Sequence, residues 1–151
     1  MTIKWEKTAL IVIDVQVGLF RMKRPIYKAE ELLENINKVT DKARKAGIPV
    51  IYVQHANKSK LAKETEGYNI HPSLKPQKED PRYHKTVGSA FEETSLHEDL
   101  QKKGIETLVI TGLMTNACIN KNSRAAKKLG YKVILVSDGH SRDAKEEKQG
   151  K

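Results

Sequence analysis

Cys118 is the only cysteine in the sequence and the side chain best suited to nucleophilic attack. It lies in the first turn of a predicted helix, shortly after an apolar segment that ends at Thr111 and is followed by Gly112. Unpaired backbone N–H groups and the positive end of the helix dipole lower the pKa of a thiol at such a place. Position alone does not decide its role, because a lone cysteine in an alanine-rich helix is more often a buried core residue.

Asp14 and Lys85 are the two residues that could activate this thiol. Asp14 follows the apolar run Thr8 to Ile13, and Lys85 belongs to a short predicted strand at residues 83–87. Ligands of open α/β sheets bind beyond the carboxyl ends of the strands, where a lysine would favour the thiolate and an aspartate could accept its proton. An aspartate at a strand end is also a common turn or cap residue. One lysine among 28 basic residues is no signal by itself.

The composition is that of a globular protein. Its 151 residues, 38% hydrophobic and 31% charged, suit a single domain over residues 1–151 with one core. No apolar run approaches the roughly 20 residues that cross a bilayer, and the N-terminus lacks a secretory signal pattern, so we expect a cytoplasmic protein. A single cysteine excludes an intrachain disulfide and a cysteine-rich zinc site.

The net charge of +9 raises the question of nucleic-acid binding. Such a function predicts a basic stripe with interleaved aromatic side chains. Here the basic residues are spread over every segment, and only 5% of the residues are aromatic. We therefore expect a small-molecule substrate and neither a nucleic-acid nor a membrane partner, with room for a weak preference for anionic substrates.

Strands and helices alternate along the sequence. The unbroken apolar runs Thr8 to Ile13 and Pro49 to Gln54 predict strands that are covered on both faces. Between them, Ala29 to Ala46 has apolar residues three and four positions apart, as an amphipathic helix does, and Gly47 ends it. The same patterns predict strands at residues 83–87, 107–111 and 132–136 and helices at 95–103 and 115–129.

Three local features carry more specific expectations. Ser95 and Glu98 resemble a capping box at the start of the helix 95–103. Gly112 is expected to open a turn. From His55 to Arg82 the pattern breaks down into polar residues and prolines, and so long an irregular stretch in a compact domain is usually a lid or a binding loop.

The alternation predicts an α/β fold, a three-layer α/β/α arrangement around a central parallel sheet. The chain stops soon after the last predicted strand, so we expect the fold to be cut short at the C-terminus. A partner subunit could cover the exposed end, and a homo-oligomer, a dimer or tetramer, is expected.

Several segments, in the right order, resemble the isochorismatase-like cysteine hydrolases, the superfamily that contains nicotinamidases and other small amidases. GLMTNAC (residues 112–118) resembles its G-x-x-T-x-x-C signature. Four further segments resemble family motifs: ALIVIDVQVGLF, HPSLKP, HKTVGSAFEETSLHEDLQKKGIETLVITG and VILVSDGHS. The resemblance covers roughly residues 8 to 141, and it implies the isochorismatase-like hydrolase fold.

The resemblance implies that Cys118 is the nucleophile, Asp14 the base, and Lys85 the residue that orients and stabilises the charged pair. It also implies a cis peptide bond between Leu113 and Met114, and an oxyanion hole formed by the backbone N–H groups of Met114 and Cys118. Such a site would attack an amide carbonyl, release ammonia or an amine, and leave a thioester that water hydrolyses. It would need no cofactor.

The sequence departs from the nicotinamidase pattern at the metal site. Nicotinamidases bind a metal through an Asp-x-His pair after the second strand and a later histidine. Here His55 lacks the aspartate, since Val53 stands two positions before it, and a third ligand beside His71 is not visible. We therefore expect no metal, with His55 a substrate-loop residue and His71 a turn residue.

Other functions stay open at this point. Isochorismate cleavage is a vinyl-ether hydrolysis that needs no thiol, so the presence of Cys118 favours amide hydrolysis over it. A non-catalytic binding or oligomerisation domain of the same fold is a further alternative. The sequence does not name the substrate. The residues that we predict to line its pocket are Phe20, Tyr68 and Phe91. Aromatic residues near strand ends are nevertheless more often part of the core.

Overall fold

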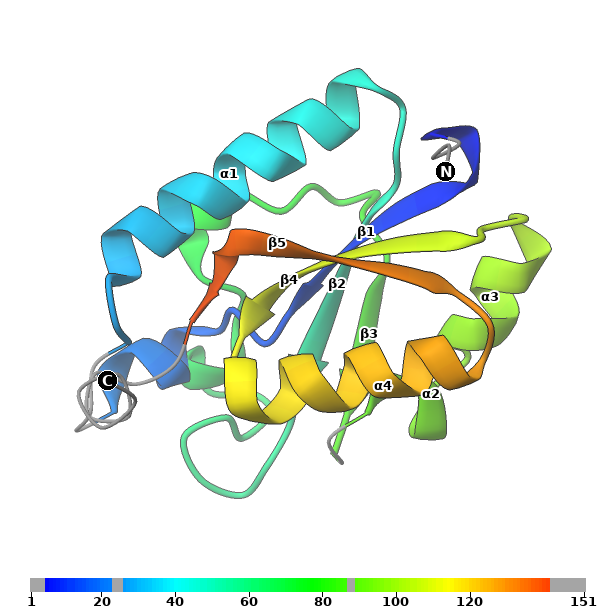
Figure 1. Cartoon of the computed structure of the whole chain (residues 1–151). Coiled ribbons are helices and arrows are strands. Elements are labelled where there is room, and N and C mark those ends of the chain that lie inside the picture. Colours follow the sequence, from blue (N-terminus) through cyan, green and yellow to red (C-terminus); the bar gives the residue numbers. More distant parts are fainter. Residues whose placement is uncertain (1–4, 23–25, 87–88, 142–151) are drawn as a thin grey trace.

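The computed structural model describes residues 5–22, 26–86 and 89–141, and a five-stranded sheet forms its centre (Figure 1). The strands are β1 (Thr8–Ile13), β2 (Val50–His55), β3 (Arg82–Lys85), β4 (Thr107–Leu113) and β5 (Lys132–Ser141). They lie in the order β3-β2-β1-β4-β5, and each neighbouring pair is parallel. All the predicted strands are therefore present, with β5 longer than expected; residue 87 of the predicted third strand lies outside the described residues.

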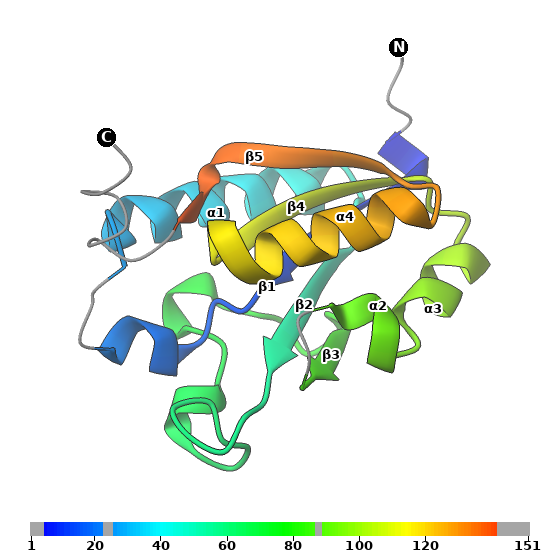
Figure 2. The ribbon, with the colours of Figure 1, turned by 60° about the horizontal axis from the view of Figure 1, so that its bottom comes forward.

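Helices cover both faces of the sheet and give the molecule three layers (Figures 1 and 2). α1 (Ala29–Lys45) packs on one face, and α2 (Ala90–Glu93), α3 (Leu96–Lys102) and α4 (Asn120–Lys128) pack on the other. The predicted α/β/α architecture is confirmed. Within the described ranges, no helix is long and apolar enough to cross a membrane.

β1 shows why the apolar runs of the sequence become central strands. All six of its residues are buried. Leu10 and Val12 pack with Ile36 of α1, whereas Ile11 and Ile13 belong to the core cluster on the opposite face. Because successive side chains of a strand point to opposite faces, a strand between two helix layers has to be apolar throughout. Burial of each such side chain stabilises the fold by about 1.5–3 kcal/mol.

Gly112 lies inside β4 and not in a turn, which corrects the sequence-based expectation. It pairs with Ile13, the last residue of β1. A Cβ atom at Gly112 would lie 2.1 Å from the carbonyl oxygen of Ile13, and the φ of +126° is one that other residues rarely adopt. Glycine is therefore required at position 112 for β4 to lie this close to β1. The contact is made at Ile13, the residue directly before Asp14.

The predicted capping box of α3 is wrong. The Ser95 side chain accepts no backbone N–H, and its hydroxyl instead donates to Asp99 at 3.0 Å. The side chain of Thr94 supplies the acceptor, since its Oγ1 lies 3.1 Å from the N–H of Leu96. Ser and Thr both accept such bonds readily, so the residue type alone did not distinguish the two positions.

The segment between β2 and β3 is largely irregular, as predicted, and contains the short turns η3 (Glu66–Tyr68) and η4 (Pro72–Leu74). It is attached to the carboxyl end of β1, because Ile70 forms an antiparallel bridge with Gln16 and the N–H of His71 donates to the Val15 carbonyl at 2.8 Å. The long segment is thereby held beside the end of the strand that precedes Asp14.

An apolar hollow of about 450 Å³ opens on the α1 face of the sheet. Val39 of α1, Val109 of β4 and Ile134 of β5 are among the residues that line it, and Trp5 lies at the same hollow with 54% of its surface exposed. The part of this face over β4 and β5 is therefore covered neither by α1 nor by another described element.

Candidate active site

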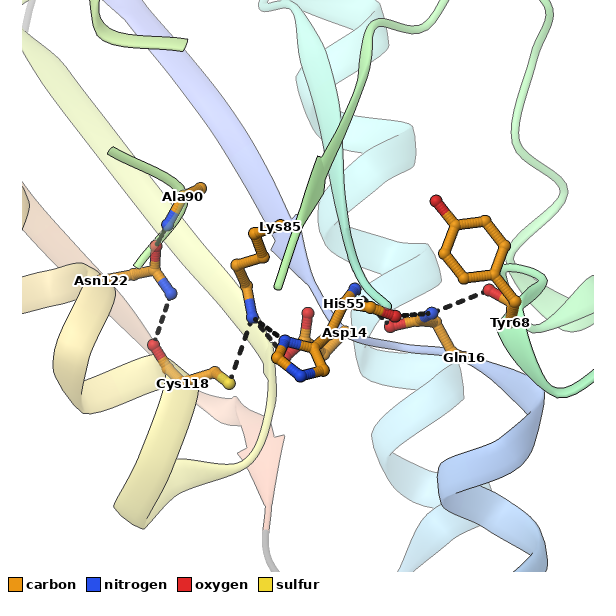
Figure 3. Close-up of polar contacts among 8 residues, drawn as sticks. All are labelled: Asp14, Gln16, His55, Tyr68, Lys85, Ala90, Cys118 and Asn122. Carbon is orange, nitrogen blue, oxygen red and sulfur yellow. Dashed lines mark hydrogen bonds and ion pairs between the residues drawn. The ribbon is translucent and has the colours of Figure 1, made fainter. Parts of the chain in front are cut away.

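The three residues of the predicted triad meet at the carboxyl ends of the strands, and Lys85 is at their centre (Figure 3). The Lys85 Nζ donates to the Asp14 Oδ2 at 3.0 Å and to the Cys118 Sγ at 3.3 Å. Asp14 directly follows β1, Lys85 is the last residue of β3, and Cys118 lies in the turn after β4. Parallel strands carry all three to the same edge of the sheet, where ligands of such folds bind.

Lys85 and Asp14 form a buried ion pair. The side chain of Lys85 is 0% exposed and that of Asp14 is 4% exposed. The free energy lost when both charges leave water is roughly equal to the free energy gained from their attraction. The pair therefore indicates that the two charged groups are held in position, and it does not by itself indicate a stabilised fold. The second oxygen of Asp14, Oδ1, is buried and has no hydrogen-bond partner among the described residues. One carboxylate oxygen thus holds the ammonium, and the other is available to accept a proton.

Asp14 is held in place by its backbone and by Gln16. Its φ is +55°, in the left-handed region that aspartate tolerates better than most residues, and its N–H donates to the Val53 carbonyl at 2.9 Å. The buried side chain of Gln16 accepts from the His55 N–H at 2.9 Å and donates to the carbonyls of His55 and Tyr68 at 3.0 and 2.8 Å. Gln16 therefore joins the segment after Asp14 to the end of β2 and to the long loop, a role that sequence reasoning missed.

Cys118 lies in a π-helical turn, η5 (Thr115–Ile119), that leads into α4. The predicted helix 115–129 is thus divided into two parts, and single π turns often occur at functional sites. The Cys118 carbonyl accepts from the side-chain amide of Asn122 at 2.7 Å, and the Asn122 Oδ1 accepts from the Ala90 N–H at 2.9 Å. The asparagine fixes the backbone of the turn that carries Cys118 against α2, and no sequence signal had marked it.

The surroundings of Cys118 do not favour the lowering of the thiol pKa that its position predicted. The pKa of Cys118 is raised to about 11 from its ordinary value of 9.0. Burial is the largest cause, and the rise caused by the Asp14 carboxylate exceeds the lowering caused by Lys85. Burial also raises the pKa of Asp14 above its ordinary 3.8, although the Lys85 ammonium opposes the rise. The helix-start argument was wrong because the thiol is desolvated and lies beside a negative charge.

His55 belongs to this site and not to the substrate loop where we expected it. It is the last residue of β2, and its Nδ1 lies 3.2 Å from the Lys85 Nζ. His71 is a turn residue, as predicted, because its Nδ1 accepts from the Ser73 N–H at the start of η4. Within the described part of the chain, no group of three or more His, Cys, Asp or Glu side chains is arranged to hold a metal ion.

The three aromatic candidates for the substrate pocket lie in different surroundings. Phe20 packs edge-on against His71 and lines a hollow of about 510 Å³ that Arg21 and Glu66 also line. Tyr68 stacks on His84, and its buried hydroxyl has no hydrogen-bond partner among the described residues. Phe91 packs against the hydrophobic core. Contact with substrate stays a prediction for all three.

The peptide bond between Leu113 and Met114 is cis, as the resemblance implied. The Met114 carbonyl accepts from the N–H groups of Ala117 and Ile119 at 3.0 and 3.2 Å, which holds this residue against the turn that carries Cys118. The assignment of the Met114 and Cys118 N–H groups as oxyanion donors stays a prediction.

Known proteins are similar to this chain in sequence and in fold. A family model described as an isochorismatase domain matches residues 8–150. The chain belongs to the isochorismatase family. It is 40% identical over 139 residues to YrdC, an uncharacterized isochorismatase family protein of Bacillus subtilis (strain 168), and the match covers 88% of this chain and 73% of YrdC.

Two further proteins that this chain resembles are named for their chemistry. Nicotinamidase 3 of Arabidopsis thaliana is 30% identical over 153 residues, covering 86% of this chain and 71% of the plant protein. The crystal structure of a cysteine hydrolase from Pseudomonas syringae pv. phaseolicola 1448A superimposes with a TM-score of 0.86 at 26% identity, covering 93% of this chain and 75% of that one. The chain is therefore a hydrolase-family protein, and the resemblance seen in its motifs is confirmed.

Proposed function

We propose that this isochorismatase-family chain is a cysteine hydrolase that cleaves the C–N bond of a small amide through a thioester. The observation that carries the proposal is the position of the Lys85 Nζ, within hydrogen-bond distance of both the Asp14 carboxylate and the Cys118 sulfur. A nucleophile, a base and a buried cation that can stabilise either anion are thereby assembled in one place.

The reaction begins with a proton transfer inside the site. Asp14 accepts the proton of the Cys118 thiol through its unpaired Oδ1, and the thiolate attacks the amide carbonyl carbon to form a C–S bond. The Lys85 ammonium stays in contact with both groups, so that the negative charge moves from oxygen to sulfur beside a fixed positive charge. This placement compensates for the raised pKa of the thiol, because the sulfur need not be ionised before substrate binds.

The carbonyl electrons move to oxygen as the C–S bond forms. We propose the backbone N–H groups of Met114 and Cys118 as the donors to this oxyanion, where each such donor contributes on the order of 3 kcal/mol. When the intermediate collapses, the C–N bond breaks and protonated Asp14 gives its proton to the departing nitrogen, which leaves as ammonia or an amine. Water then attacks the thioester and Asp14 takes a water proton. The C–S bond breaks to release the carboxylic acid, and Asp14 returns the proton to the sulfur, which restores the thiol.

Two of the related proteins support amide cleavage by cysteine chemistry. One relative is named a nicotinamidase, and one structural neighbour is named a cysteine hydrolase. The vinyl-ether hydrolysis considered above does not need the thiol that Lys85 contacts here, so the same geometry argues for amide hydrolysis.

The proposal is tested by measuring ammonia release from a panel of small primary amides. The wild-type protein should turn over at least one member of the panel, and Cys118→Ala should lower kcat/KM by at least about 10³-fold. Lys121→Ala is the matched control, because Lys121 is exposed on α4, the helix that directly follows the turn of Cys118. Retention of activity by a folded Cys118→Ala protein, or no release from any amide, would overturn the proposal.

A further inference from the structure

The hydrogen bonds around the Lys85 ammonium saturate its donors. An ammonium carries three N–H groups and no acceptor. Among the described residues, three acceptors lie within hydrogen-bond distance of the Lys85 Nζ: the Asp14 Oδ2 at 3.0 Å, the His55 Nδ1 at 3.2 Å and the Cys118 Sγ at 3.3 Å. Two of them are accounted for by the proposed triad, and His55 is the third.

This contact determines the protonation of the His55 ring. An ammonium nitrogen can only donate, so the His55 Nδ1 has to accept and therefore carries no proton. The ring is then neutral, with its proton on Nε2. A protonated imidazolium would place a second positive charge 3.2 Å from the ammonium and remove the acceptor.

The sheet itself holds the two side chains together. His55 and Lys85 are register partners in the parallel pair β2 and β3, so their side chains leave the sheet side by side on one face. Both backbone groups of His55 are bound by the side chain of Gln16, its N–H at 2.9 Å and its carbonyl at 3.0 Å. The Lys85 carbonyl accepts from the Ala56 N–H at 2.8 Å, which continues the pairing past the strand end.

We infer that His55 is a positioning residue of this site, whose neutral ring accepts the third hydrogen bond of the Lys85 ammonium and so aims the other two at Asp14 and Cys118. The inference rests on the proposed function for its catalytic consequence. It goes beyond it by giving a role to a fourth side chain, which acts through the Lys85 ammonium.

Full burial makes this third acceptor matter. The Lys85 side chain is 0% exposed, so an N–H that loses its partner has no access to bulk water. Without this partner the nitrogen can rotate toward another acceptor and away from the sulfur. The developing thiolate then loses the positive charge beside it.

The test uses substitutions that differ in where they place an acceptor. The Oδ1 of an asparagine reaches about the position of a histidine Nδ1, whereas a glutamine places its acceptor near Nε2 instead. His55→Asn should therefore keep the contact with Lys85, and His55→Gln and His55→Leu should lose it. His84→Asn is the matched control, since His84 directly precedes Lys85 on β3 and its ring stacks on Tyr68.

The first readout needs no substrate. Alkylation of Cys118 by iodoacetamide reports how readily the thiolate forms, and its rate is measured from neutral to alkaline pH. His55→Leu and His55→Gln should react about 10- to 100-fold more slowly than wild type, the size expected for losing a hydrogen bond to a buried charge. Their rate curves should be displaced to higher pH. His55→Asn should stay within about 3-fold of wild type, and the melting curves of all the variants show whether folding has changed.

The second readout is amide turnover on whichever amide the wild-type protein cleaves. kcat should fall in His55→Leu and return in His55→Asn, with little change in KM, because His55 acts through Lys85 and not through substrate binding. Equal alkylation rates in wild type and His55→Leu, or a failure of His55→Asn to rescue a folded protein, would overturn the inference. If no amide is cleaved by wild type, the proposed function fails while the alkylation series still decides the role of His55.

Discussion

The side chain of Asn122 clamps the carbonyl of Cys118, one helical turn earlier, with a hydrogen bond of 2.7 Å. The same side chain accepts from the Ala90 N–H at 2.9 Å, so the turn that carries the thiol is attached to α2 by one buried amide. Such a bridge sets where the sulfur lies relative to Lys85 without taking part in the reaction.

Substitution of Asn122 by leucine should therefore lower both stability and activity. Leucine has a similar size but offers no polar group, so the Cys118 carbonyl and the Ala90 N–H each lose a partner, at about 1–3 kcal/mol each. Chemical denaturation measures the stability change, and ammonia release measures the activity. Asn120→Leu, at an exposed position of the same helix, is the control and should change neither by much. A fully active, fully stable Asn122→Leu protein would contradict the assignment.

Removal of the buried charges should separate catalysis from stability. Lys85→Met leaves the Asp14 carboxylate buried without a counter-ion, which should cost about 3–5 kcal/mol of unfolding free energy and abolish turnover. The double variant Asp14→Asn with Lys85→Met removes both charges. It should recover much of the stability and none of the activity, as denaturation and ammonia release would show. If the double variant were no more stable than Lys85→Met alone, the buried ion pair would not be the source of the loss.

The raised thiol pKa predicts slow alkylation of the free protein at neutral pH. Only the thiolate reacts, and a pKa near 11 in place of 9.0 leaves a smaller fraction ionised at every pH below that range. Iodoacetamide should therefore label Cys118 more slowly than a small free thiol at neutral pH, and the rate should keep rising toward pH 11. Labelling faster than the free thiol would mean that the ammonium of Lys85 outweighs burial and Asp14 together.

Gly112→Ala should disrupt the junction of β1 and β4. The added methyl group would lie 2.1 Å from the Ile13 carbonyl oxygen at a φ of +126°. The strands have to separate beside Asp14, so we expect a loss of more than about 3 kcal/mol or no folded protein. Gly104→Ala is the matched control, since its φ is +72° and the added carbon would have open space around it, with no close contact to residues beyond its own stretch of chain. That change should cost only about 1–2 kcal/mol, and equal thermal stability of the two variants would refute the steric argument.

Much of the fold could be predicted from local patterns. The run Thr8 to Ile13 became β1 with the predicted bounds, and the amphipathic segment from Ala29 became α1. These predictions succeeded because burial constrains the sequence locally. A helix buried on one side has apolar residues three and four positions apart, and a strand buried on both faces is apolar throughout. Gly112 was misplaced because a glycine at a turn and a glycine under a neighbouring strand look alike in one sequence.

The sequence by itself determined the components of the site: one thiol, an aspartate after the first strand, a lysine in the short third strand, and motifs in family order. Only the tertiary structure decided what surrounds them. The strand order sets β3 and β4 on opposite sides of β1 and β2, so the environment of Cys118 depends on residues far away in the chain. Its raised pKa, the clamp from Asn122 and the contact between His55 and Lys85 follow from desolvation and distance, which no local pattern records.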